Sequence, residues 1–130
     1  MKTFALELYS TDARTRIENA QAFVGADASG SFGILAGREP LATALVWGLC
    51  SLRTSDRARR QYVALPGGVL YFADDLLRVC AQRFLVDEDP QRIVAQLTRE
   101  MHAERDVTRD MHALLRKLDD ELLTRLLEAP

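Results

Sequence analysis

Apolar and polar positions alternate through the first two thirds of the chain. The run from Phe4 to Tyr9 (FALELY) places an apolar side chain at every second position, which is the period of a half-buried strand. Further apolar runs follow at residues 21–25, 31–35, 41–47, 49–53, 61–65, 69–73 and 77–84. Glycine-bearing or polar turns separate these runs. Short strands with frequent turns predict an antiparallel β-sandwich or barrel and disfavour a βαβ fold.

The pattern changes near residue 87, where helical periodicity begins. Asp89 followed by Pro90 is a favourable N-cap and first helical position. Apolar side chains then recur at helical spacing in two stripes. The first consists of Ile93, Val94, Leu97 and Met101, and the second, denser one of Val107, Met111, Leu114, Leu115, Leu118, Leu122, Leu123, Leu126 and Leu127. We therefore predict a β-sandwich head over residues 1–86 and a C-terminal helical tail over 87–130. The leucine stripe must pack on its own first helix, on the head or on another protein.

The tail has two candidate conformations, a helical hairpin and a single long helix. Residues 104–108 contain neither glycine nor proline, and Thr108 lacks the Glu or Gln partner of a capping box. The apolar spacing also continues through this segment. These features favour a nearly continuous helix in at least one state.

Composition excludes several functional classes. The 48% apolar content is enough for a core, and a formal charge of −2 gives no overall attraction to nucleic acid or anionic lipid. Cys50 and Cys80 lie in apolar runs without metal-ligand spacing, so we expect reduced, buried thiols, with a disulfide or metal site as the alternative. The N-terminus has no apolar leader segment, and a cytoplasmic protein is the expectation.

No catalytic or metal-binding constellation is recognisable. His102 and His112 lack metal-site spacing, and we expect partly exposed helix side chains. The glycines between Gly30 and Gly37 are not followed by the Gly-Lys-Ser/Thr of a phosphate loop. A basic line at helical spacing consists of Arg105, Arg109, His112 and Arg116, and it is either a solvated face or a contact for an acidic protein partner.

Four segments, in order, resemble one known family. Residues 30–41 (GSFGILAGREPL) resemble the "GxLGILPGHAPL" segment of the epsilon subunit of F-type ATP synthases, called delta in mitochondria. Residues 24–27 (VGAD) and 64–74 (ALPGGVLYFAD) are similar to that family's "GxxG" and "xxSGGFLEVxDN" segments, and residues 1–9 are similar to its opening strand. A helical tail after a head of this length is also the family's layout.

The resemblance implies a small β-sandwich head with a helical C-terminal part and a non-catalytic role in the central stalk. The head would bind the gamma subunit and rest on the rotor ring of c subunits, at the cytoplasmic face of the bacterial inner membrane. Two turns would face the ring, with contacts from Gly30, Ser31, Phe32, Gly37, Arg38, Glu39 and Leu41. The tail would rise along gamma toward the catalytic alpha and beta subunits and restrain ATP hydrolysis. Its regulatory residues would be Arg105, Arg109, Arg116, Leu114, Leu118, Leu122 and Leu126.

Three positions depart from the family pattern. Ala36, Arg38 and Glu39 replace the proline, histidine and alanine of "LPGHAP". These replacements imply a rotor ring with different surface charges. The altered turn and the run from Tyr71 to Asp74 are similar to the alternate, N-type F-type ATPases proposed to pump sodium, so the coupled ion would be a proton or sodium.

Some family members bind ATP on the tail through an Ile/Leu-Asp-x-x-Arg-Ala motif and a later arginine. Asp89, Arg92 and Arg99 match its charged positions, whereas Glu88 and Ile93 do not match its apolar and alanine positions. A plain N-cap also accounts for Asp89, and we expect no bound cofactor. The alternatives to a stalk subunit are a self-associating scaffold with a coiled-coil tail and, more distantly, a nucleotide-hydrolysing enzyme.

Overall fold

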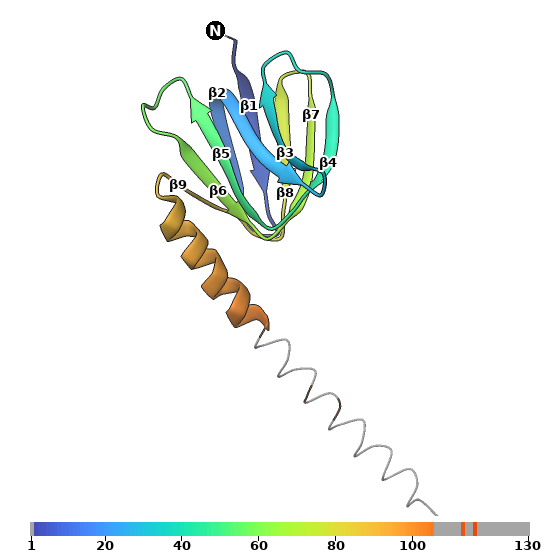
Figure 1. Ribbon diagram of the computed structural model, residues 1–130, viewed down its shortest axis with the longest axis vertical. Coiled ribbons are helices and arrows are strands. Elements are labelled where there is room, and N and C mark those ends of the chain that lie inside the picture. The colour runs from blue at the N-terminus through green and yellow to red at the C-terminus, as the bar shows by residue number, and fades with distance from the viewer. Residues whose placement is uncertain (1, 106–112, 114–115, 117–130) are drawn as a thin grey trace, which may run out of the picture. The chain divides into compact units, whose positions relative to one another are not determined.

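The computed structural model describes residues 2–105 together with Ala113 and Arg116 (Figure 1). The chain divides into two compact units, Met1–Leu97 and Thr98–Pro130. Within the described residues the first unit contains nine strands: β1 (Phe4–Tyr9), β2 (Arg14–Asp27), β3 (Gly30–Leu35), β4 (Leu41–Leu45), β5 (Gly48–Thr54), β6 (Gln61–Leu65), β7 (Gly68–Ala73), β8 (Leu76–Cys80) and β9 (Leu85–Asp87). The predicted β-sandwich followed by a helix is confirmed.

The long strand β2 joins both layers of the sandwich. Its first half pairs with β1, and β1 continues through β8 and β7 to β4. Its second half pairs with β3 and with β5, and β5 continues through β6 to β9. The register shifts between Ala20 and Ala22, next to Asn19 with a φ of 61°. Asparagine tolerates this left-handed conformation, so the irregularity lets β2 change layers.

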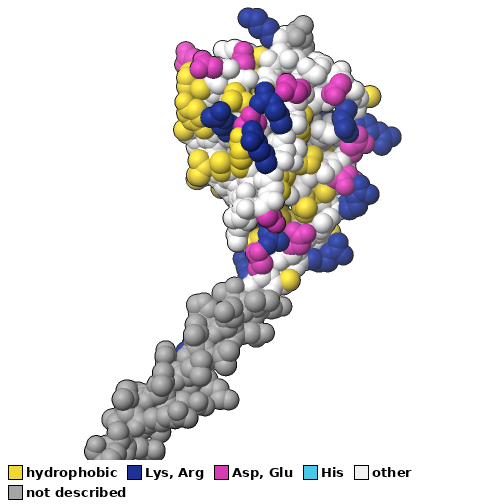
Figure 2. Space-filling model, turned by 180° about the vertical axis from the view of Figure 1, so that it is seen from behind, with side chains coloured by type: hydrophobic (Ala, Val, Ile, Leu, Met, Phe, Trp, Pro, Cys, Tyr) yellow, Lys and Arg dark blue, Asp and Glu magenta, His cyan; other side chains and the backbone are white. Residues whose placement is uncertain are grey.

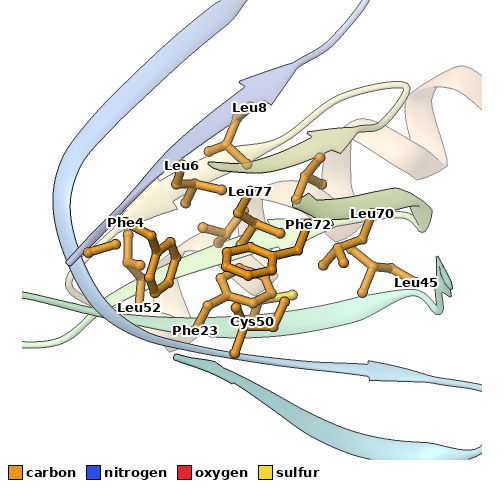
Figure 3. Packing of buried hydrophobic residues seen from close by; sticks show 14 of the residues in the cluster. Phe4, Leu6, Leu8, Phe23, Leu45, Cys50, Leu52, Leu70, Phe72 and Leu77 are labelled. Atoms are coloured by element: carbon orange, nitrogen blue, oxygen red, sulfur yellow. The ribbon is translucent and has the colours of Figure 1, made fainter. Parts of the chain in front are cut away.

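The core lies between the two layers and draws on alternate positions of the strands. Phe4, Leu6 and Leu8 point inward from β1 toward Phe23 of β2 and Phe72 of β7 (Figure 3). The rings of Phe4 and Phe72 meet edge to face, with centroids 5.6 Å apart. Each fully buried leucine or phenylalanine contributes about 1.5–3 kcal/mol, so this cluster dominates the stability of the head.

The structure corrects three predictions from the sequence. Residues 14–20 belong to β2, although their polar composition gave no strand signal. The predicted strand over 77–84 ends at Cys80 as β8, and a separate strand, β9, begins at Leu85. The pair β1–β8 is parallel, whereas the other strand pairs of the described residues are antiparallel.

A helix begins at Pro90 and continues to residue 105, where the continuous description ends. Asp89 caps it, because its Oδ1 accepts hydrogen bonds from the backbone N–H of Gln91 at 3.1 Å and of Arg92 at 3.3 Å. Ile93 and Leu97 on its first turns are buried, as their apolar spacing predicts. The two units divide after Leu97, and the domain boundary that composition places after residue 86 stays a prediction.

Most predicted features of the tail lie outside the described residues. Arg105 and Arg116 are helical and exposed, and Arg99 is an exposed helical residue of the second unit. Arg109, Leu114, Leu118, Leu122, Leu126 and His112 lie outside the described residues, as does most of the segment that distinguishes a hairpin from a long helix. Within the described part of the chain, no helix has the length and apolar content needed to span a bilayer.

Candidate functional site

The turn that precedes β3 is held by the carboxylate of Asp27. Asp27 Oδ1 accepts hydrogen bonds from the backbone N–H of Ser29 at 2.9 Å and from its hydroxyl at 2.5 Å, and Oδ2 accepts the hydroxyl of Thr43 at 2.7 Å. These bonds, led by that from the Ser29 hydroxyl, lower the pKa of Asp27. One side chain therefore fixes the turn before Gly30 and ties it to β4, the strand that begins at Leu41.

The second turn, residues 36–40, is fastened to a different hairpin. Gly37 has a φ of 82°, which favours glycine, and its backbone N–H donates to Asp75 Oδ1 at 2.6 Å. Arg38 turns back along β3, and its Nη1 lies 3.4 Å from the carbonyl oxygen of Gly33. The structure thus brings Arg38 to the strand that carries the first turn.

The predicted ring-contact residues divide into two groups by burial. Gly30, Ser31, Gly37, Arg38 and Glu39 are exposed. Phe32 and Leu41 are half-buried and pack against the core cluster, so part of each side chain faces inward. The two turns lie at opposite ends of β3, and together with that strand they form one edge of the head. Its exposed surface is mainly polar and charged, with Arg38 and Glu39 at the second turn, but it also includes Leu35, which is 62% exposed.

The outer face of the layer formed by β1, β8, β7 and β4 is a second surface, which the sequence analysis did not single out. Val69 is 60% exposed and Tyr71 is 49% exposed. Their register partners on β4, Ala44 and Ala42, are also exposed, and β4 leads to exposed Val46 and Trp47. A signal was present, because the run from Val69 to Ala73 is apolar on both faces, which indicates a covered outer face.

The same face carries a cluster of arginines around Glu7. Glu7 Oε1 accepts a hydrogen bond from Arg16, and Oε2 accepts the hydroxyl of Tyr9. Arg14 Nη2 lies 3.9 Å from Oε1, and Arg78 Nε lies 3.7 Å from Oε2. The bond from Tyr9, helped by Arg16 and Arg14, holds the pKa of Glu7 below its ordinary value, while burial acts in the opposite direction.

The possible nucleotide-binding residues already have roles inside the chain. Asp89 caps the helix, and Arg92 forms a two-pronged ion pair with Asp87, with Nε 2.9 Å from Oδ2 and Nη2 2.5 Å from Oδ1. Arg92 is the main reason that the pKa of Asp87 is lowered. Nucleotide binding by Asp89, Arg92 and Arg99 stays a prediction. Among the described residues, no group of three or more His, Cys, Asp or Glu side chains is placed to hold a metal ion.

The two cysteines differ in a way that the sequence did not predict. Cys50 is buried in the core, as expected, and burial raises the pKa of its thiol to about 11. Cys80 is exposed, which corrects the expectation of a buried thiol. Cys80 lies opposite Val69 and Tyr9 in the sheet register, so it belongs to the outer face of the layer.

Comparison with known proteins assigns the family. The profile of the ATP synthase delta/epsilon chain β-sandwich domain matches residues 3–86. The chain belongs to the delta/epsilon family of ATP synthase subunits. The ATP synthase epsilon chain of Streptomyces avermitilis is 34% identical over 113 residues, covering 85% of this chain and 90% of that relative. The predicted resemblance to the epsilon subunit is therefore confirmed.

Solved structures with this fold include chains of two mitochondrial ATP synthases. A chain of the Euglena gracilis enzyme, determined as an OSCP/F1/c-ring assembly, superposes with a TM-score of 0.58 at 19% identity. A chain of the Tetrahymena thermophila central stalk and c-ring superposes with a TM-score of 0.52 at 11% identity. The match to the Euglena chain covers 75% of this chain and 62% of that one, and the match to the Tetrahymena chain covers 65% and 66%. This chain therefore spans slightly less than two thirds of the length of either solved chain. At these identities the likeness to this epsilon-family chain is one of fold.

Proposed function

We propose that this chain is a non-catalytic central-stalk subunit of a rotary F-type ATP synthase. The head binds the gamma subunit and rests on the ring of c subunits, and the helical tail restrains ATP hydrolysis by the alpha and beta subunits. The observation that carries this proposal is the match of the family's β-sandwich domain to residues 3–86, which includes both candidate surfaces. The complex, and this chain with it, lies at the cytoplasmic face of the bacterial inner membrane.

The polar edge, which consists of β3 and the turn at each of its ends, is the proposed ring contact. Asp27 and Asp75 hold the turns in place through bonds to Ser29, Thr43 and Gly37, so the edge meets its partner with little ordering cost. Arg38 and Glu39 are exposed there. Exposed charges at such a contact favour a ring whose loops carry complementary charge.

The outer face with Val69 and Tyr71 is the proposed gamma contact. This face gathers exposed apolar side chains, and small alanines lie beside them. Such a surface allows the close approach of a protein partner. The face and the polar edge are distinct surfaces of the same head. One subunit can therefore contact gamma and the ring together.

Site-specific cross-linking in the enzyme purified from membranes tests this arrangement. Single cysteines would replace Ser31, Glu39, Ala42 or, as the control, Ala58, all of which are exposed, in a Cys80→Ser background. A photoactivatable maleimide reagent on Ser31→Cys or Glu39→Cys should give products with c subunits, and on Ala42→Cys a product with gamma. Ala58→Cys, in the β5–β6 turn, should give neither. Products of both turn positions with gamma alone would show that the proposed orientation is wrong.

A further inference from the structure

Three arginines from β2 and β8 surround Glu7 of β1 and carry more charge than its carboxylate neutralises. One carboxylate, that of Glu7, lies near Arg14, Arg16 and Arg78, and its side chain is only 5% exposed. Arg16 also pairs with Glu18, with Nε 2.6 Å from Oε1. Three arginines therefore face two carboxylates, those of Glu7 and Glu18, which leaves one net positive charge on this surface.

The three arginines are exposed, yet a side-chain nitrogen of each lies within 3.9 Å of a carboxylate oxygen of Glu7. Their side chains are 66%, 47% and 54% exposed for Arg14, Arg16 and Arg78. The guanidinium of Arg14 also stacks over the ring of Tyr9, 5.2 Å from its centroid. A shared buried carboxylate and a stacked ring restrict these long side chains, which reduces the entropy that binding would cost.

The register of the sheet places the cluster beside the exposed apolar side chains. Glu7 is opposite Arg78, Arg78 is opposite Tyr71, and Tyr71 is opposite Ala42. In the next row Arg14, Tyr9, Cys80, Val69 and Ala44 follow one another. Figure 2 shows dark-blue side chains around a magenta one on a face of the head that also carries hydrophobic side chains. The face has an apolar area with a basic margin.

We propose that Arg14 and Arg78, held over Glu7, bind one or more carboxylates of the gamma subunit while an apolar segment of gamma covers Tyr71 and Val69. This inference rests on the proposed function and adds the chemistry of the partner surface, an apolar segment bordered by Asp or Glu. The planar guanidinium group of arginine can donate two parallel hydrogen bonds to one carboxylate. Arginine and tyrosine are also the residues that most often dominate protein interfaces. The apolar half favours a protein over a charged lipid headgroup.

The test measures binding of purified full-length chain to purified gamma at low and high salt. Arg14→Gln/Arg78→Gln keeps Arg16 and Tyr9 as partners of Glu7, and thermal unfolding verifies its fold. We expect binding to gamma to weaken about tenfold or more and to lose much of its salt dependence. Arg53→Gln/Arg59→Gln, which removes two exposed arginines near or in the β5–β6 turn, should bind as the unmodified chain does. Tyr71→Ser, at an exposed site, should weaken binding independently of the arginines.

The outcomes separate this inference from the proposed function. Equal binding of gamma by Arg14→Gln/Arg78→Gln and by the unmodified chain would overturn the inference and leave the stalk assignment intact. Loss of binding to phosphatidylglycerol vesicles without loss of binding to gamma would also overturn it, because the ligand would then be lipid. Failure of the unmodified chain to bind gamma at any salt concentration would overturn both.

Discussion

The two thiols of the chain lie in opposite environments, and their reactivity follows from this. Cys50 is buried and the pKa of its thiol is raised to about 11, whereas Cys80 is exposed. We expect a maleimide at about pH 7 to label the folded chain once, and the unfolded chain twice, by mass spectrometry. Cys80→Ser should abolish labelling of the folded chain. Two labels on the folded chain would contradict the packing of Cys50.

Glu7 ties the stability of the head to pH. Because the fold lowers the pKa of Glu7 from its ordinary 4.5, its stabilising contribution is complete above pH 4.5 and is lost as the pH falls through the folded-state pKa. Glu7→Gln should therefore be less stable than the unmodified chain at neutral pH, and the difference should shrink below pH 4.5. Urea unfolding at a series of pH values measures this. Glu18→Gln, whose side chain is 63% exposed, is the control and should show little difference at any pH.

For individual residues, the sequence predicted exposed polar turns. It predicted neither the exposed apolar side chains around Tyr71 nor the arginines around Glu7 on the outer face. Asp89 as a helix cap was predictable, because its neighbours Pro90 and Ile93 give a local signal. Glu7, Arg14 and Arg78 come from three strands, and only the strand register brings them together. Without the register, Glu7 is one more polar position in an alternating run.

The turn between β3 and β4 is held by a hydrogen bond to the neighbouring β7–β8 hairpin. Asp75 Oδ1 accepts the N–H of Gly37, and Asp75 and Asp74 both have left-handed backbones, with φ of 57° and 52°. Asp75→Ala should lower the free energy of unfolding by about 0.5–1.5 kcal/mol more than Asp74→Ala, which introduces alanine at a similar backbone conformation without losing this bond. Urea unfolding of both variants measures the difference. Equal losses would show that the bond does not hold the turn.

Among the strands, those with clean alternation were predictable and the long one was not. The ranges predicted for β1 and β6 match the structure, because each has an uninterrupted apolar face between turn signals. The first half of β2 is largely polar, because its outward-facing side chains belong to the Glu7 cluster. Only Ile17 and Ala20 are apolar there, which is too few for a strand pattern. Its role as the link between the layers depends on Asn19, a local irregularity that no pattern of period two encodes.

For the whole molecule, the main consequence is the proposed regulation by the tail. Deleting residues 107–130 should leave the head folded, because its core cluster is drawn entirely from residues before Asp87. ATP hydrolysis by the assembled enzyme should then rise, while ion-coupled synthesis need not fall. Reversing the charges of Arg105, Arg109 and Arg116 should give the same rise if these arginines hold the inhibitory state. Unchanged hydrolysis in the truncated enzyme over a range of ATP concentrations would show a purely structural tail.

The sequence predicted the two-part architecture because glycine-rich alternation and glycine-free helical periodicity are strong signals over long stretches. It predicted the family because four segments matched in order. The N-type assignment and the coupled ion stay predictions, since they depend on the replacements at Ala36, Arg38 and Glu39, whose partner surface belongs to another subunit. The conformation of the tail beyond residue 105 also stays a prediction.

We propose that this chain works as one subunit of the ATP synthase stalk and not as a self-associating scaffold. The most direct measurement is the stoichiometry of the complex that a tagged, full-length chain brings from detergent-solubilised membranes of its own cells, determined by quantitative mass spectrometry. We expect one gamma subunit for each copy of this chain, accompanied by alpha, beta and c subunits. Recovery of a homo-oligomer of this chain without gamma would contradict it.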